Sequence, residues 1–169
     1  MKTKKLVLLG LLTAIALTIF MVEAQLPAPV PIAGIKLGLS NIVTVFAVFA
    51  IGSREGAAIL FARIFLGAVF AGNFSTVLYS GAGGLCAILA TILLRKILTN
   101  RQLWVAGSLS AVAHSIGQMV AAIAISGTPG LAVYLPIMMA CSVITGLFTG
   151  LCAQFVLNRG EKVWKTFLQ

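Results

Sequence analysis

The feature that most constrains this chain is a succession of apolar runs, most of them long enough to cross a lipid bilayer as a helix, which takes ~20 residues. The breaks between the runs are short and rich in Pro, Gly, Ser and Asn, as is typical of turns. We expect six helices, at Leu6–Val22, Leu37–Ile51, Glu55–Ala71, Ser75–Leu98, Leu103–Ser126 and Leu131–Leu157. The sequence therefore predicts an all-α integral membrane protein, a six-transmembrane-helix bundle that forms one domain over residues 1–169.

The composition supports a lipid environment and argues against a nucleic-acid partner. Hydrophobic residues make up 60% of the chain and charged residues only 9%, whereas soluble domains carry about 25% charged residues. Lys and Arg number twelve, against three acids. These basic residues stand at the edges of apolar runs and do not suggest the folded basic surface that nucleic acid requires.

The positions of the basic residues predict the topology. If the N-terminus is cytoplasmic, the external segments hold one basic residue, Lys36, and Arg63 lies inside a span. The cytoplasmic segments then hold Lys2, Lys4, Lys5, Arg54, Arg95, Lys96, Arg101, Arg159, Lys162 and Lys165. Ten against one satisfies the positive-inside rule, so we expect both termini in the cytoplasm.

The N-terminus also has a signal-peptide character. "MKTKK", an apolar run and "VEA" before Gln25 match the layout of a secretory signal. Cleavage there would leave five spans. We expect a retained first helix, because its apolar run is long for a signal peptide.

Catalytic and metal-binding motifs are missing from the sequence. There is no G-x-x-x-x-G-K-[ST] nucleotide loop, and no aspartate for the carboxylate clusters that hold Mg²⁺. Cys86, Cys141 and Cys152 have no C-x-x-C spacing, so we interpret them as small buried hydrophobic residues. We expect neither an enzyme on its own nor a bound metal or cofactor.

Arg63 is the one basic residue far from both ends of its apolar run. It lies about nine residues into the third run, or roughly 13 Å at 1.5 Å per residue, which is close to the middle of the bilayer. An arginine at this depth is costly and should face the bundle interior. Two interpretations stay open: a planar guanidinium that anchors a carboxylate or phosphate, and an arginine satisfied by neighbouring helices.

Further polar residues fall near the same depth or near the external side. His114 and Gln118 are four residues apart and share a helix face. They either hydrogen-bond a ligand or join helices. Lys36 and Asn41 follow a proline-rich external loop that either caps a pocket or simply connects two helices. Asn73 and Tyr79 lie near the external ends of the third and fourth helices, where we expect them to complete such a pocket.

Small residues recur at four-residue spacing on two helices. Gly10, Ala14 and Thr18 on the first helix predict a smooth strip for another helix, within the chain or from a partner. Gly146 and Gly150 form a G-x-x-x-G on the sixth helix, a pattern that is common in membrane helices.

The stretch "LLTAIALTIFMVEAQLPAPVPIAGIKLGLSNIVTVFAVFAIG", and above all "GIKLGLSN", resembles a bacterial membrane family. That family is the Gx transporter family, or heptaprenyl diphosphate synthase component I. It is similar in layout to the substrate-binding S components of energy-coupling factor (ECF) vitamin transporters. The resemblance implies a six-helix protein of the bacterial cytoplasmic membrane that binds a small molecule from outside. Transport would need a membrane scaffold subunit and two cytoplasmic ATPases, and Gly10, Ala14 and Thr18 match the scaffold-contacting A-x-x-x-A pattern approximately.

We therefore expect a substrate-binding subunit of an ECF-type importer for a small anionic or polar metabolite or vitamin. One alternative is a non-catalytic membrane component associated with heptaprenyl or other prenyl diphosphate synthesis, and another is an autonomous small transporter or channel. The expected substrate-binding residues are Arg63, Lys36, Asn41, Asn73, Tyr79, His114 and Gln118.

Overall fold

The computed structural model describes residues 2–26, 38–72 and 75–160, and every regular element in these ranges is helical. In chain order the elements are α1 (Lys2–Glu23), α2 (Asn41–Ala50), α3 (Ser53–Ala71), α4 (Ser75–Arg95), α5 (Leu103–Ser126), the 3₁₀ helix η1 (Pro129–Tyr134) and α6 (Leu135–Arg159). The all-α class expected from the apolar runs is confirmed.

Four segments of the described chain are long and apolar enough to cross a membrane: Thr3–Glu23, Val77–Arg95, Leu103–Ser126 and Pro129–Arg159. Helix α3 has 19 residues but carries three charged ones, Arg54, Glu55 and Arg63. Helix α2 has only 10 residues, which gives it a length of about 15 Å, half the thickness of the hydrocarbon core. It begins later than the expected Leu37 because Gly38 has a φ of 80°, a left-handed conformation that no α-helix contains.

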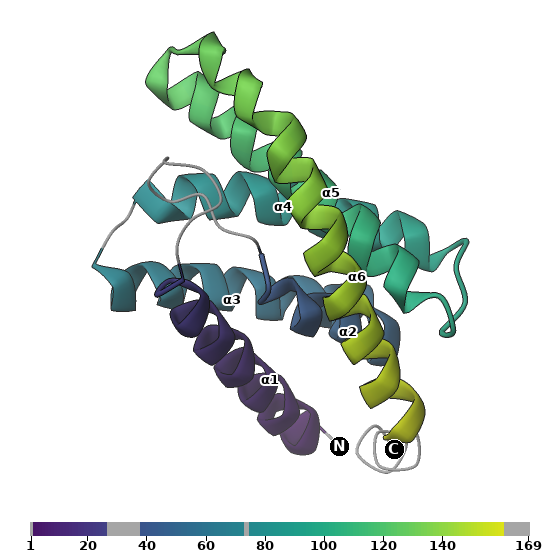
Figure 1. Cartoon of the computed structure of the whole chain (residues 1–169). Helices are drawn as coiled ribbons and strands as arrows, with labels where there is room; N and C mark the ends of the chain where they lie inside the picture. The colour runs from purple at the N-terminus through teal and green to yellow at the C-terminus, as the bar shows by residue number, and fades with distance from the viewer. Residues whose placement is uncertain (1, 27–37, 73–74, 161–169) are drawn as a thin grey trace.

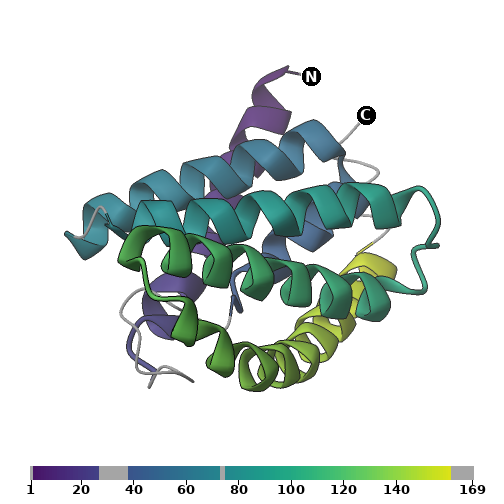
Figure 2. The same cartoon turned by 90° about the horizontal axis from the view of Figure 1, so that it is seen from above.

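The helices alternate in direction, so that the start of α1 and the end of α6 lie at the same end of the molecule (Figures 1 and 2). Two side-chain contacts connect the start of α3 to this end of the molecule. Lys5 Nζ donates to Glu55 Oε1 over 2.5 Å, linking the starts of α1 and α3. Arg95 Nη1 lies 3.5 Å from Ser53 Oγ, linking the end of α4 to the start of α3. We call this end of the bundle the basic end.

Glycines allow α5 and α6 to cross at backbone contact. A Cβ atom on Gly146 would lie 2.6 Å from Ser108 Cα and 2.7 Å from the Gly107 carbonyl oxygen. A Cβ atom on Gly150 would lie 2.5 Å from the Leu103 carbonyl oxygen. The G-x-x-x-G of α6 therefore packs α6 against α5 within the same chain.

Candidate functional site

A cluster of buried polar side chains lies inside the bundle, where α1, α2, α3 and α5 approach one another. Each of its members is at most 4% exposed. The polar cluster consists of Glu23, Ser40, Asn41, Arg63, His114 and Gln118. Such groups are costly to remove from water unless they are hydrogen-bonded, so their partners decide what the cluster is for.

Arg63 is held on one side only. Its Nη1 donates to Ser40 Oγ over 2.7 Å, its guanidinium carbon lies 5.7 Å from the centroid of the Phe20 ring, and the Glu23 carboxylate stabilises its charge. Its Nε and Nη2 have no hydrogen-bond partner in the described part of the chain. These two nitrogens form one edge of the planar guanidinium, and such an edge binds a carboxylate or phosphate with two parallel hydrogen bonds.

Glu23 fixes the turn that precedes α2. Its Oε1 accepts a hydrogen bond from the Gly38 backbone N–H over 2.5 Å, which ties the end of α1 to this turn. The Arg63 bond to Ser40 holds the same turn from the α3 side. Neither Glu23 nor Ser40 was among the residues predicted for the site. The one available signal for Glu23 was its position, since it is an acid at the end of an apolar run in a chain with three acids.

Two glycines bring the amide and imidazole side chains together. A Cβ atom on Gly83 would lie 2.7 Å from Gln118 Cγ and 2.9 Å from His114 Cε1. A Cβ atom on Gly38 would lie 3.1 Å from Asn41 Nδ2 and 3.4 Å from His114 Cδ2. His114 therefore lies close to both glycines. A Cβ atom on Gly83 would collide with His114 and Gln118, whereas a Cβ atom on Gly38 would crowd Asn41 and be in ordinary contact with His114.

Much of the hydrogen-bonding capacity of these side chains is unused. Within the described ranges, both amide atoms of Asn41, both amide atoms of Gln118 and Nδ1 of His114 lack a partner. An unsatisfied buried donor or acceptor costs about 1–3 kcal/mol, and the described residues do not offset that cost for these atoms.

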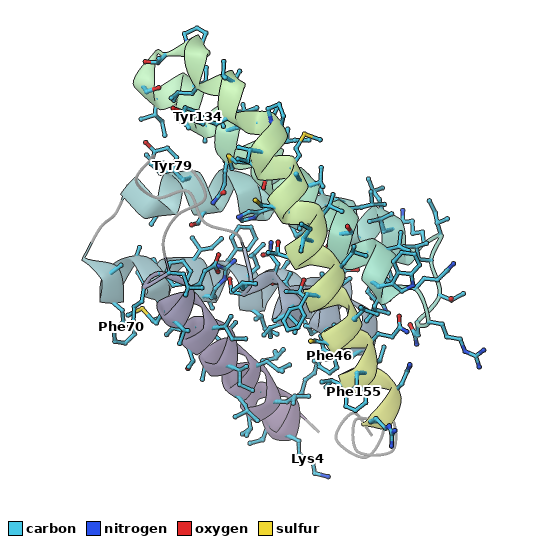
Figure 3. All side chains as sticks on the ribbon, viewed as in Figure 1. Lys4, Phe46, Phe70, Tyr79, Tyr134 and Phe155 are labelled. Carbon is cyan, nitrogen blue, oxygen red and sulfur yellow. The ribbon has the colours of Figure 1, made fainter. Side chains whose placement is uncertain are left out.

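Four of the seven residues expected at the substrate site meet in this cluster: Asn41, Arg63, His114 and Gln118. Tyr79 is half-buried and packs against the group formed by Met119, Ala122 and Met138, and Figure 3 shows it toward the end of the molecule where Tyr134 lies. Lys36 and Asn73 lie outside the described residues.

The small residues of α1 face away from the bundle. Gly10, Ala14 and Thr18 are all exposed, and a Cβ atom on Gly10 would meet nothing within 4 Å. The opposite face of α1 is buried through Leu8, Leu12, Ala16 and Phe20. The outward strip of α1, defined by Gly10, Ala14 and Thr18, is therefore not used for packing within the described part of this chain.

Potential metal ligands do not gather in the described ranges, where no group of three or more His, Cys, Asp or Glu side chains occurs. Cys86, Cys141 and Cys152 are free and half-buried. The chemistry of the polar cluster is that of hydrogen bonding, one guanidinium and one carboxylate.

Comparison with known families gives one result. The family model described as heptaprenyl diphosphate synthase component I matches residues 12–156, a range that includes the whole polar cluster. No curated protein and no solved structure matches the chain.

Proposed function

The chain belongs to the heptaprenyl diphosphate synthase component I family, and for this member we propose a role in ligand capture within the membrane. It is the substrate-binding subunit of an ECF-type importer, and it carries no catalytic activity of its own. Its ligand is a small metabolite or vitamin with a polar or anionic group.

The observation that supports this proposal most strongly is the free edge of Arg63. A buried arginine that only joined helices would have its donors directed at carbonyls and hydroxyls. Here Nη1 is bound to Ser40, while Nε and Nη2 lack partners in the described part of the chain. Asn41, His114 and Gln118 offer further donors and acceptors around it, as expected for a site that orients one polar ligand.

The topology proposed for this role has six membrane segments with both termini in the cytoplasm of a bacterium. The four long apolar helices supply four segments. α3 and the short α2 supply the other two, and Asn41, Thr44 and Arg63 on these helices are buried inside the bundle. Support comes from the common end of α1 and α6 (Figure 1) and from the basic residues at that end, which the positive-inside rule places inside.

The ligand enters from the external side in this proposal. The turn Gly38–Ser40 and the start of α2 lie on that side of Arg63. Lys36, Asn73 and Tyr79 are proposed to complete the entrance, as the sequence predicts.

Energy for transport has to come from partners, because the sequence has no nucleotide-binding loop. We assign the outward strip of α1 to the scaffold subunit, which would link the chain to two cytoplasmic ATPases. Its small side chains allow close approach of another membrane helix.

A second candidate function follows from the description of the family. In that case the chain is a non-catalytic membrane component that assists a prenyl diphosphate synthase. The two candidates differ in their partners. Co-expression with the scaffold and ATPases of the same genome should yield a stable complex if the chain is an importer subunit. Co-expression with the prenyl synthase should yield one if the chain assists that enzyme. The identity of the neighbouring genes makes the same distinction.

Ligand binding tests the proposal. Purified protein in nanodiscs would be screened by thermal shift against vitamins and anionic metabolites, and hits would be titrated on wild type, Arg63→Gln and Arg159→Gln. We expect Arg63→Gln to weaken binding about tenfold or more, the factor that corresponds to losing a hydrogen bond to a charged group. Arg159→Gln removes an exposed arginine and should leave binding unchanged. Equal binding by Arg63→Gln and wild type would show that Arg63 is not the anchor.

A further inference from the structure

An apolar groove with a volume of about 210 Å³ lies between α1, α2 and α6. All of its lining side chains are apolar, among them Leu12 and Ile19 on α1, Ile42 on α2 and Val156 on α6. A groove of this size with an apolar lining suits a segment of a hydrocarbon chain.

Two of the residues that line the groove are next in sequence to residues at the polar cluster. Ile42 directly follows Asn41, and Ile19 directly precedes Phe20, whose ring contacts the Arg63 guanidinium. From Ile19 to Leu12 the groove follows α1 for about 10 Å at 1.5 Å per residue, toward the basic end of the bundle. One end of the groove is therefore within about one helical turn of the polar cluster along both α1 and α2.

The other access to the groove is lateral. α1 packs on α3 and α2, and Figure 1 shows α1 and α6 diverging from each other. Ile15 and Val156 line the groove from these two helices and are 43% and 44% exposed. In a membrane protein this opening faces hydrocarbon.

We propose that the ligand of the polar cluster is an amphiphile with an oxyanion head at Arg63 and a single apolar tail in the groove. Its head enters on the external side, and its tail passes into the groove from the lipid. The inference rests on the proposed function in placing the ligand at Arg63, and it adds the substrate class. A wholly water-soluble ligand would leave the groove without a role. A neutral lipid tail would leave the free edge of Arg63 without a role. An amphiphile accounts for both features and for their adjacency.

Photoaffinity labelling tests this assignment in nanodiscs. The probes are dodecyl phosphate with a terminal diazirine and the uncharged dodecanol with the same diazirine, and labelled peptides are identified by mass spectrometry. We expect the phosphate probe to label the Leu12–Ile19, Ile42–Phe46 and Val156 regions about tenfold more than the alcohol, the factor expected for one charge-assisted hydrogen bond. Both probes have the same tail and partition into the same bilayer, so the difference reports the head group.

Three variants complete the experiment. Arg63→Gln should reduce groove labelling by the phosphate probe to the level of the alcohol. Arg63→Met, which also removes the charge, replaces it with the same expectation if the glutamine variant does not fold. Val156→Phe should fill the groove and reduce labelling as well. Val143→Phe is the matched control, because Val143 is on the same helix and is 40% exposed but does not line the groove; it should label like wild type.

The outcomes separate the inference from the proposed function. Equal labelling by the two probes, or labelling that Arg63→Gln or Val156→Phe leaves unchanged, would overturn the amphiphile. If the metabolite screen meanwhile yields an Arg63-dependent ligand that has no tail, the proposed function stands alone. If neither the dodecyl phosphate probe nor any screened compound depends on Arg63, both are wrong.

Discussion

At the scale of single residues, the polar groups of the bundle fall into two kinds. Several hydroxyls have a hydrogen-bond partner within the protein: Ser115 and Ser142 bond to each other over 2.5 Å and link α5 to α6, and Thr91 donates to the Ala87 carbonyl of its own helix. The atoms around Arg63 are different, because several of them lack partners in the described ranges. This difference is the basis for the proposal that the residues around Arg63 bind a ligand.

Gln118 provides a test of that distinction through stability. Both of its amide atoms are buried without a partner among the described residues, and such groups cost about 1–3 kcal/mol. We expect Gln118→Met, which keeps the length of the side chain, to raise or preserve the free energy of unfolding of the ligand-free protein while weakening ligand binding. Thermal unfolding of purified protein, followed with and without ligand, would measure both effects.

Ser142→Ala is the control for this experiment. Ser142 donates to the Met138 carbonyl over 2.7 Å and pairs with Ser115, so its loss leaves a buried hydroxyl unpaired and should cost about 1 kcal/mol. If Gln118→Met destabilises the protein as much as Ser142→Ala does, Gln118 is a structural residue and the ligand interpretation of its amide is wrong.

The sequence predicted Arg63, His114 and Gln118 as site residues because each stands out in a local pattern. The depth of Arg63 in an apolar run, and the four-residue spacing of His114 and Gln118, are local properties that the sequence displays. The approach of Ser40 to Arg63 and the bond from Gly38 to Glu23 depend on how α1, α2 and α3 pack. No local pattern indicates which distant residues will meet.

At the scale of elements, helix interiors followed the apolar runs and helix ends followed local chemistry. α5 has the expected range, Leu103–Ser126, because turn residues flank its apolar run on both sides. The sixth run was expected from Leu131, but α6 begins at Leu135, after the 3₁₀ helix Pro129–Tyr134. Pro136 lies in the first turn of α6, where its missing N–H is tolerated. Because η1 and α6 form one apolar span, hydropathy alone did not separate the 3₁₀ helix from α6.

The glycine crossing of α5 and α6 predicts a large effect from a small change. Gly146→Ala would place a methyl group 2.6 Å from Ser108 Cα and 2.7 Å from the Gly107 carbonyl oxygen. Both neighbours are backbone atoms, so the helices must separate, and we expect a loss of about 1–3 kcal/mol in the free energy of unfolding. Unfolding by denaturant in mixed micelles would measure it.

Gly10→Ala is the matched control on α1. A Cβ atom at Gly10 meets nothing within 4 Å, and alanine favours a helix by about 1 kcal/mol over glycine. This variant should be as stable as wild type or more so. A loss of stability equal to that of Gly146→Ala would show that the outward strip of α1 packs against another part of the protein.

At the scale of the whole molecule, the polar cluster lies between two parts of the bundle. α5 packs closely along α4 and α6, with glycines at both contacts, and it contributes His114 and Gln118. α1, α2 and α3 form the other part and contribute Glu23, Asn41 and Arg63. A ligand at Arg63 therefore contacts both parts, and the apolar groove beside it is likewise shared between α1, α2 and α6.

The proposed orientation of this bundle can be measured with single cysteines. The background replaces the three native cysteines, which are half-buried, with alanine, and the introduced sites are Lys4→Cys, Lys96→Cys and Thr128→Cys. All three positions are exposed. Lys4 and Lys96 are at the basic end, whereas Thr128 is at the opposite end, between α5 and η1.

A membrane-impermeant maleimide applied to intact cells should label Thr128→Cys and leave the other two unlabelled until the membrane is permeabilised. The physical reason is the asymmetry of charge: ten basic residues belong to the proposed cytoplasmic side and one to the external side, and the loss of a single lysine does not reverse such a bias. If Lys4→Cys is labelled in intact cells while Lys96→Cys is protected, the start of α1 lies outside the cell, and the proposed orientation of α1 is wrong. Labelling of both, with Thr128→Cys protected, would invert the whole bundle and place the entrance to the Arg63 site in the cytoplasm.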